Sequence, residues 1–213
     1  VLKNRIALCE ELGLSTKRLI LPHQTHGVIV RKVDSRLLDL DEKQQTADLE
    51  GVDAVMTNMT RVCVAVSTAD CIPILLYDEK QHACCAVHAG WRGTVNRIVE
   101  KAIAEMIANY GSEPAMFHAC IGLGISLEKF EVGDEVWQEF ADAGFDMDKI
   151  SRRSVKWHVD LWECNRIQLV DAGVNPRNVS VAGICTYSHA DEFFSARKLS
   201  INSGRILTGI FLN

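Results

Sequence analysis

Three short segments, far apart in the chain, each carry a side chain that binds borderline-soft metal ions. His26 closes the motif His-Gln-Thr-His, Cys71 closes Thr-Ala-Asp-Cys, and His88 opens His-Ala-Gly-Trp-Arg-Gly. Two imidazoles and one thiolate suit Zn²⁺ and leave a fourth coordination position open for water or substrate, as in catalytic zinc sites. Because only a folded domain can bring such distant segments together, the motifs predict a specific tertiary structure with a catalytic metal site.

The ligand within the first motif stays open on sequence grounds, since His23 and His26 lie three residues apart. In an irregular segment, either imidazole can bind the metal while the other lies beside it. His88 ends an apolar, strand-like run and precedes Ala-Gly, which allows a sharp turn. A histidine at a strand end is more often structural, but the Gly-Trp-Arg-Gly sequence that follows favours a functional site.

Neighbours of these motifs are candidate catalytic residues. Asp70, next to Cys71, can orient an imidazole or carry a proton, although a role in a cap or turn is equally compatible with its position. Trp91 can form a pocket wall, and Arg92 can bind an anionic group. Polar residues surround Cys71 where its strand should end, which distinguishes it from an inert buried thiol.

The composition is typical of a soluble globular enzyme with one domain, at 213 residues, 47% hydrophobic and 24% charged. A net charge of −5 gives no argument for a nucleic-acid or anionic membrane partner. No apolar run approaches the roughly 18–20 residues that span a bilayer. The chain begins at Val1 with neither a signal peptide nor an initiator methionine, so we expect that an upstream segment is missing.

The eight cysteines indicate reduced thiols in a cytoplasmic protein rather than a disulfide framework, since most lie in apolar, strand-like runs. Cys84 and Cys85 are adjacent, so in a strand they point to opposite faces and cannot share one metal ion. We expect inert, buried thiols at four further positions: Cys9, Cys63, Cys120 and Cys164.

The hydrophobic pattern predicts a compact α+β domain, because its strands and helices alternate too irregularly for a βαβ winding. Apolar runs bounded by turn residues predict strands at 18–21, 28–30, 53–57, 62–67, 72–77, 83–88, 115–121, 179–185 and 206–211. Helical spacing predicts helices at 4–12, 94–110, 132–140 and 160–172. Residues 34–51 are charged and lack apolar periodicity, which predicts a surface excursion.

The motifs together resemble the YfiH-like (DUF152) family, also called multi-copper polyphenol oxidoreductase or laccase-domain proteins, which includes purine nucleoside phosphorylases. The likeness is carried by His-Gln-Thr-His-Gly, Ala-Asp-Cys-Ile-Pro and His-Ala-Gly-Trp-Arg-Gly-Thr. Later segments extend it over almost the whole chain, at residues 130–133, 160–161, 185–186, 193–197 and 204–205.

This resemblance implies that residues 1–213 form a single domain with four α/β/β/α layers and mixed β-sheets, related to toxin deamidases. It also implies that His26, Cys71 and His88 are zinc ligands. The implied activity is phosphorolysis of adenosine, inosine, guanosine and methylthioadenosine, with adenosine deamination at the same site. The implied partners are therefore a purine nucleoside and phosphate, bound by a monomer.

Within that activity, Asp70 is our candidate proton carrier, alongside catalytic Cys71 and His88. Arg92 or Arg197 can hold phosphate through bidentate hydrogen bonds. We expect three residues to contact the substrate: Gln24, Trp91 and Arg197.

Two departures from the family pattern bear on the pocket. Relatives usually begin earlier, with a strand that carries Thr-Arg-x-Gly-Gly, and nothing here matches it. We therefore expect the domain to lack an N-terminal strand segment. Where relatives often have Ser-Tyr-Arg, this chain has Ser195-Ala196-Arg197, so one aromatic side chain is lost.

Other functions compete with this interpretation. The resemblance also implies a zinc amidase that edits a peptidoglycan precursor, UDP-muramyl-serine, a role in which some bacterial relatives are implicated. A copper polyphenol oxidase (laccase) fits less well, because no methionine follows Cys71 before Met106 and no His-x-His motif is present. A metal-free hydrolase would use Cys71 as nucleophile and His88 as base. A structural zinc or partner-binding domain is the non-enzymatic alternative.

Overall fold

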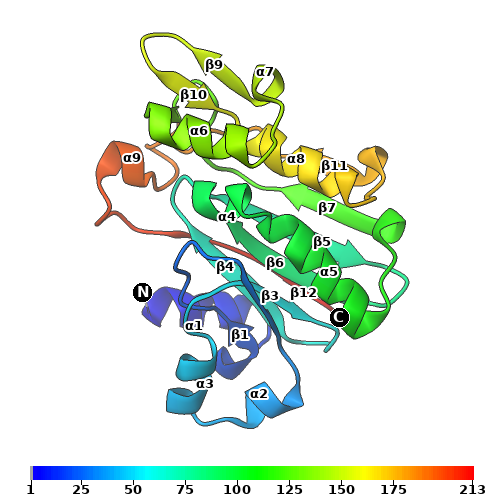
Figure 1. The fold of residues 1–213 in the computed structure, drawn as a ribbon. Coiled ribbons are helices and arrows are strands. Elements are labelled where there is room, and N and C mark those ends of the chain that lie inside the picture. Colours follow the sequence, from blue (N-terminus) through cyan, green and yellow to red (C-terminus); the bar gives the residue numbers. More distant parts are fainter. Residues whose placement is uncertain (1) are drawn as a thin grey trace.

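A six-stranded mixed sheet forms the centre of the computed structural model, which describes residues 2–213 (Figure 1). Antiparallel β3, β6, β5 and β7 form its middle, and parallel β2 and β11 flank them. The order is β11 (Val179–Val181), β7 (Phe117–Ile121), β5 (Ile72–Asp78), β6 (Ala83–Ala89), β3 (Val52–Thr57) and β2 (Ile29–Lys32). The middle strands read as continuous apolar runs because both of their faces are covered.

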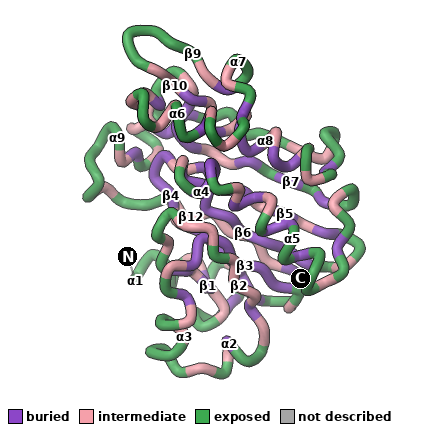
Figure 2. The backbone as a smooth tube through the Cα atoms, viewed as in Figure 1, coloured by how far each residue is buried: buried purple, intermediate pink, exposed green. Residues whose placement is uncertain are grey.

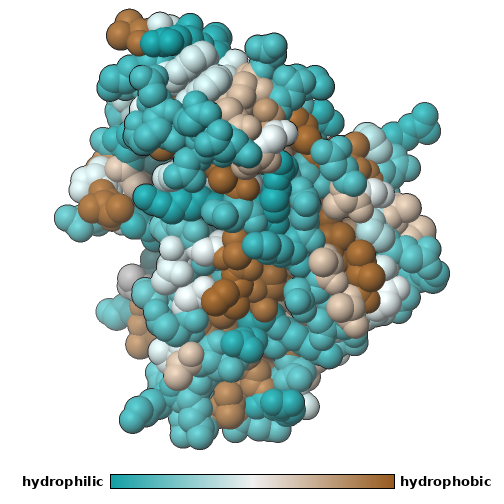
Figure 3. Space-filling model, in the orientation of Figure 1, coloured by the Kyte–Doolittle hydropathy of each residue, from teal (hydrophilic) through white to brown (hydrophobic). Residues whose placement is uncertain are grey.

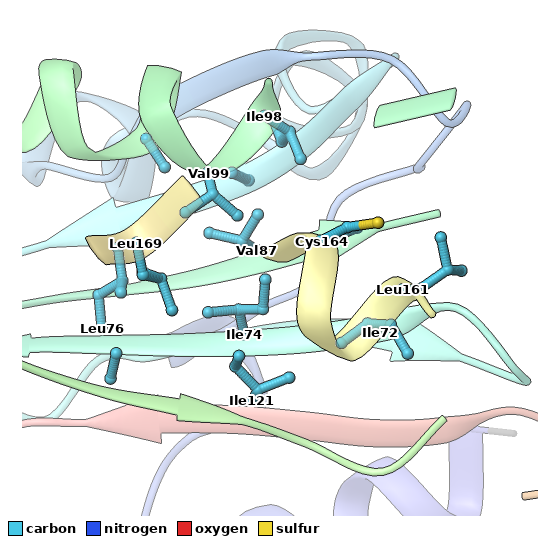
Figure 4. Close-up of a cluster of buried hydrophobic side chains, with 14 of the residues drawn as sticks. Ile72, Ile74, Leu76, Val87, Ile98, Val99, Ile121, Leu161, Cys164 and Leu169 are labelled. Atoms are coloured by element: carbon cyan, nitrogen blue, oxygen red, sulfur yellow. The ribbon is translucent and has the colours of Figure 1, made fainter. Parts of the chain in front are cut away.

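Three helices cover one face of this sheet: α4 (Trp91–Val95), α5 (Ile98–Tyr110) and α8 (Leu161–Asp171) (Figure 1). Figure 4 shows the core that they enclose, where Leu76 of β5 lies beneath Leu169 of α8 and Ile74 lies beside Val87 of β6. As predicted, α5 ends at Gly111, which adopts the left-handed conformation that glycine tolerates best.

A second sheet covers the opposite face of the six-stranded sheet, in the order β1 (Leu19–Ile20), β4 (Cys63–Thr68) and β12 (Ile206–Phe211). Val64 and Val66 of β4 pack toward the larger sheet. On the outer side of β4, Ala65 packs against Leu14, in the turn that follows α1 (Leu2–Glu11). This outer layer completes the predicted four-layer α/β/β/α arrangement of mixed sheets.

The alternation of side chains along β6 determines which side of the sheet carries His88. Cys85 and Val87 face the helices, whereas Cys84 and Ala86 face β4, so the adjacent cysteines point to opposite faces as expected. His88 lies two residues beyond Ala86 and therefore shares its face. The imidazole consequently lies between the two sheets, at the end of β6.

A further group of elements packs at one end of the domain, at the top of Figure 1. They are the sheet of β8 (Glu131–Val132), β10 (Trp157–Val159) and β9 (Ser151–Arg153), with helices α6 (Asp134–Asp142) and α7 (Met147–Ile150); α9 (Ala196–Leu199) precedes β12. The prediction that a helix starts at residue 132 was wrong, because Val132 belongs to β8. The strand predicted at residues 179–185 ends at Val181, and Gly183 then adopts a positive φ.

Residues 34–51 contain two short helices, α2 (Ser35–Asp39) and α3 (Glu42–Asp48), and are not simply a surface excursion. Asp34 caps α2 by accepting the amide of Leu37, and Asp41 forms a capping box with α3. Leu37 and Leu49 are buried against the second sheet. The sequence prediction missed this anchoring because each helix is too short to display apolar periodicity.

Burial follows the layers, with buried strands in the centre and exposed segments on the outer helices (Figure 2). All eight cysteines are free, but Cys120 is exposed, contrary to the prediction, because the β7 side chains alternate and Cys120 faces away from the core. Figure 3 shows a largely hydrophilic face on which hydrophobic side chains gather in a few patches. Within residues 2–213, no helix combines the length and apolar character required to cross a bilayer.

Candidate metal centre

The three predicted ligands converge at one end of the space between the sheets. The donor atoms of His26, Cys71 and His88 all lie within 4.8 Å of one another, a grouping that can hold a metal ion. The centroids of the two imidazole rings are 4.9 Å apart, and the ring planes are inclined by 73°. His26 lies in the loop before β2, Cys71 lies in the turn between β4 and β5, and His88 lies on β6.

Strand register explains why Cys71 and His88 meet. In the antiparallel pair β5 and β6, Pro73 lies opposite His88 and Ile72 lies opposite Ala89. Cys71, just before β5, is therefore adjacent to the end of β6 that carries His88. The turn at Gly90 completes the approach, because a Cβ atom there would lie 2.8 Å from Cδ2 of His26 and 3.2 Å from the Cys71 sulfur.

A fully buried carboxylate, Asp53 of β3, connects two of the ligand-bearing segments. Oδ1 accepts hydrogen bonds from Nδ1 of His88, at 2.8 Å, and from the amide of His26, at 3.0 Å. Oδ2 accepts the amides of Thr25 and Gly27, at 3.2 and 2.7 Å. Since an ionised carboxylate can only accept, Nδ1 of His88 keeps a proton, so Nε2 is the nitrogen that can bind a metal once the imidazole is neutral.

These contacts shift the pKa values of both partners. Burial alone would raise the pKa of Asp53, but the hydrogen bond from His88 and those from two loop amides outweigh burial and lower the pKa of this carboxyl. Burial alone would lower the pKa of His88, but hydrogen bonds to Asp53 and Cys71 raise it to about 9. In the metal-free protein, the site therefore favours an imidazolium beside two anionic groups.

The thiol of Cys71 has a lowered pKa, which favours its anionic form at this centre. Burial would raise the pKa of Cys71, but hydrogen bonds with His26 and His88 dominate and lower it to about 6. By contrast, burial raises the pKa of Cys63 to about 11 and that of Cys84 to about 12. Against the effect of burial, hydrogen bonds with two serines also lower the pKa of Cys185, but this thiol does not belong to the donor group. A thiolate is the form of cysteine that binds metals.

Both ligand-bearing turns contain a non-glycine residue with a positive φ, 64° at His26 and 86° at Asp70. Such conformations are uncommon for residues with a side chain and persist where surrounding contacts hold them. At His26 the restraint is the bond from its amide to Asp53. At Asp70 it is the bond from the amide of Ile125 to the Asp70 carbonyl, at 2.9 Å.

The carboxylate of Asp70 forms no hydrogen bond with a histidine of residues 2–213. Its Oδ1 accepts the hydroxyl of Thr186 and its Oδ2 accepts the amide of Arg197, both at 2.7 Å. Asp53, rather than Asp70, thus accepts a hydrogen bond from an imidazole. The signal that could have revealed Asp53 is its position, since an acidic residue inside an apolar strand must be buried with partners.

The side chains of the first motif, His-Gln-Thr-His, make different contacts. His26 joins the donor group, whereas Nδ1 of His23 lies 2.7 Å from Oε1 of Glu50, at an exposed position. The amide group of Gln24 makes two bonds to the backbone of Ser67 on β4, to its carbonyl at 2.9 Å and from its amide at 2.8 Å. Gln24 therefore fastens the loop to the second sheet.

The donor group opens into a cavity of about 700 Å³. Its wall contains apolar Ile125 and Phe130 and three arginines, Arg5, Arg197 and Arg205. Gln24, Asp70, Cys71 and His88 also line it. Arg197 and Arg205 lie in segments that carry the family likeness, residues 193–197 and 204–205, but a site role was predicted only for Arg197. Nothing in the sequence pointed to Arg5.

Trp91 and Arg92 do not line this cavity. After Gly90 the chain enters α4, which packs on the helix side of the six-stranded sheet, whereas the cavity opens on the other side. Trp91 accordingly packs against the helix-side core, and the guanidinium of Arg92 lies over its ring, 4.4 Å from the centroid. Trp91, which was expected to form a pocket wall, and Arg92, which was expected to bind an anion, therefore lie outside the cavity.

The side chains present fit a bound metal. Two imidazoles and a thiol of lowered pKa converge, and a buried carboxylate orients one of the imidazoles, as is usual around metal-bound histidines. A Cβ at position 90 would intrude on this group.

Comparison with known proteins places this chain among named relatives. A purine nucleoside phosphorylase of Bacteroides thetaiotaomicron is 45% identical over all of this chain and 80% of its own length. Adenosine deaminase RL5, from an unknown prokaryotic organism, is 42% identical over 99% of this chain and 81% of its own length. The crystal structure of Bacillus licheniformis hypothetical protein YfiH superposes with a TM-score of 0.91 at 27% identity, covering 99% of this chain and 80% of that one.

These relatives support an enzyme. The family model described as multi-copper polyphenol oxidoreductase laccase matches residues 1–213. The chain therefore belongs to the family of multi-copper polyphenol oxidoreductase laccase proteins, which is the YfiH-like family that its motifs resemble.

Proposed function

We propose that this chain is a zinc-dependent purine nucleoside phosphorylase that acts on adenosine, inosine, guanosine and methylthioadenosine, with adenosine deamination at the same site. The observation that carries the proposal is the group of His26, Cys71 and His88, which opens into a cavity large enough for a nucleoside. Relatives named purine nucleoside phosphorylase and adenosine deaminase support the choice of substrate.

In this proposal His26, Cys71 and His88 hold the metal, and Asp53 keeps His88 in the tautomer that presents Nε2. When bound, zinc supplies Lewis-acid activation of water or of the purine. Zinc is preferred to copper because no methionine of residues 2–213 lines the cavity, and mononuclear blue-copper sites usually add a weak methionine ligand. Metal analysis with a visible spectrum tests this choice, since a Cu(II)–thiolate is coloured and zinc is not.

Arg197 is the residue that we assign to phosphate. Its amide donates to Asp70 and its Nη1 donates to the carbonyl of Glu131 at 2.9 Å, which fixes the side chain at the cavity wall. A guanidinium can hold phosphate through two parallel hydrogen bonds. Because both oxygens of Asp70 have donors, we now assign Asp70 to positioning Arg197 rather than to carrying a proton.

The experiment is product analysis after the zinc-loaded protein is incubated with adenosine and phosphate. Adenine with ribose 1-phosphate indicates phosphorolysis, and inosine indicates deamination. Cys71→Ala should abolish both products, whereas the matched variant Cys120→Ala, an exposed thiol outside the cavity, should retain them. Neither product from the wild-type protein, or full activity in Cys71→Ala, would refute the proposal.

A further inference from the structure

A second cavity of about 580 Å³ adjoins the metal-bearing one. Four residues line both cavities: Arg5, Leu21, Ser67 and Arg205. The second cavity extends between α1 and β12, where its walls also include Leu8, Phe194 and Leu207. The two spaces thus form one cleft, with the pair of arginines at the boundary between them.

The side chain of Arg205 is held in place before any ligand arrives. Its Nη1 donates to the carbonyls of Ser203 and Gly204, at 2.7 and 3.0 Å, and its Nη2 donates to the carbonyl of Ile201 at 3.0 Å. These bonds fix the guanidinium but leave its charge without a counterion. A guanidinium fixed in this way loses less conformational entropy when it binds an anion.

The boundary is cationic despite the net charge of −5 on the chain. Neither Arg5 nor Arg205 has a carboxylate within 4.0 Å in the part of the chain that the structure describes. Among residues 2–213, no acidic side chain lines the second cavity, and the carboxylate of Asp70 in the first is already hydrogen bonded to Thr186 and the backbone. Two uncompensated cations at one boundary favour an anionic ligand.

The apolar wall of the second cavity suits a ligand larger than a free ion. The tip of the Phe194 ring packs on Gly204, where a Cβ would lie 2.5 Å from its Cζ, and 45% of Phe194 remains exposed. Because Gly204 has no side chain, its backbone can lie against the Phe194 ring and support it from one side. This leaves an aromatic surface beside the arginine pair.

We propose that Arg5 and Arg205 form a phosphoryl-group subsite at the boundary of the two cavities, separate from the metal centre. The chemistry recognised is a phosphate dianion with two or more oxygens available to guanidinium N–H groups. It has two possible sources, the inorganic phosphate consumed in phosphorolysis or a phosphate ester carried by the purine substrate. Assigning either source to turnover rests on the proposed function, whereas binding itself does not.

The test measures binding by calorimetry on the zinc-loaded chain. The probes are inorganic phosphate, adenosine and adenosine 5′-monophosphate. The variants are Arg205→Gln and Arg5→Gln, with Arg36→Gln as the matched control, an exposed arginine on α2 that lines neither cavity. We expect Arg205→Gln to weaken binding of a phosphoryl probe about ten- to a hundredfold, the size expected for lost charge-assisted hydrogen bonds, while adenosine binding and Arg36→Gln stay unchanged.

Weaker binding of inorganic phosphate to the variants assigns the co-substrate to this arginine pair in place of Arg197, and KM for phosphate should then rise while deamination is unaffected. Weaker binding of the nucleotide alone assigns it to a phosphate ester. The proposal is overturned if the wild-type protein binds neither phosphoryl probe, or if both arginine variants bind them as tightly as the wild type. If Arg205→Gln unfolds, Arg5→Gln decides, because Arg5 is exposed on α1. Binding without turnover of any nucleoside would reject the proposed function and leave the subsite standing.

Discussion

Replacing Asp53 by asparagine should weaken metal binding, although Asp53 is not itself one of the proposed metal ligands. The substitution disturbs the hydrogen bonds that hold two of those ligands, His26 and His88. Asparagine keeps the shape of the carboxylate, but one of its two terminal groups is an NH₂, which donates instead of accepting. Each Asp53 oxygen accepts two hydrogen bonds, and the side chain is fully buried. Whichever way the amide is turned, two donors therefore lose their acceptor.

The two orientations damage the site differently. With NH₂ at the Oδ1 position, His88 must accept through Nδ1, so its proton moves to Nε2 and blocks the nitrogen that would bind the metal. With NH₂ at the Oδ2 position, the amides of Thr25 and Gly27 lose their acceptor and the loop that carries His26 is released. A buried donor without an acceptor costs about 1–3 kcal/mol. The first orientation leaves one such donor, the amide of His26, whereas the second leaves two and costs about 2–6 kcal/mol.

The assay is competition for Zn²⁺ between metal-free protein and a chromogenic chelator, combined with urea unfolding. We expect zinc affinity to fall about 10- to 100-fold, as is typical when the partner of a metal-bound histidine is lost, and the free energy of unfolding to fall as well. Asp39→Asn, an exposed aspartate on α2, is the control. Zinc affinity in Asp53→Asn equal to that of the wild type would refute the reasoning, whatever happened to stability.

Three further predictions concern the same centre. In the metal-free protein at neutral pH, iodoacetamide should modify Cys71 faster than the exposed Cys120, and mass spectrometry locates the label. The rate of Cys71 modification should fall as pH drops below about 6, and bound zinc should protect Cys71 from modification. Gly90→Ala should lower zinc affinity because its methyl group meets His26 and Cys71, whereas Gly111→Ala, whose methyl meets nothing within 4 Å, should lower only stability. The two pKa shifts should act on the stability of the metal-free protein in opposite directions. The contribution of Cys71, whose pKa is lowered from 9.0 to about 6, is complete above about pH 9 and is lost as pH falls through about 6, whereas the contribution of His88, whose pKa is raised from 6.5 to about 9, is complete below about pH 6.5 and is lost as pH rises through about 9. Between about pH 6.5 and about pH 9 these two contributions should therefore offset each other. Urea unfolding of the wild type and of Cys71→Ala checks this prediction, because removing the thiol should make stability fall with rising pH in this window, and identical pH profiles would contradict it.

Much of the fold could be read from local pattern. Runs such as residues 83–88 predicted strands buried on both faces, and the adjacent Cys84 and Cys85 do point to opposite cores because side chains alternate along a strand. Helical spacing predicted one helix over residues 94–110, and its stop at Gly111 is confirmed. The structure breaks this helix at Arg97, whose φ is positive, so that α5 begins only at Ile98. Short helices capped by Asp34 and Asp41 escaped prediction, since a turn or two of helix shows no period.

The sequence by itself determined the donor chemistry, because two imidazoles and a thiolate in characteristic motifs are a local property of the chain. Tertiary structure alone decided which neighbours join them. Trp91 and Arg92 follow His88 within four residues, yet the turn at Gly90 sends them to the opposite side of the sheet. Asp53, 35 residues from His88, lies in contact with it because β3 and β6 pair side by side. Sheet register and layer packing set these distances, and neither is encoded in the spacing of residues along the chain.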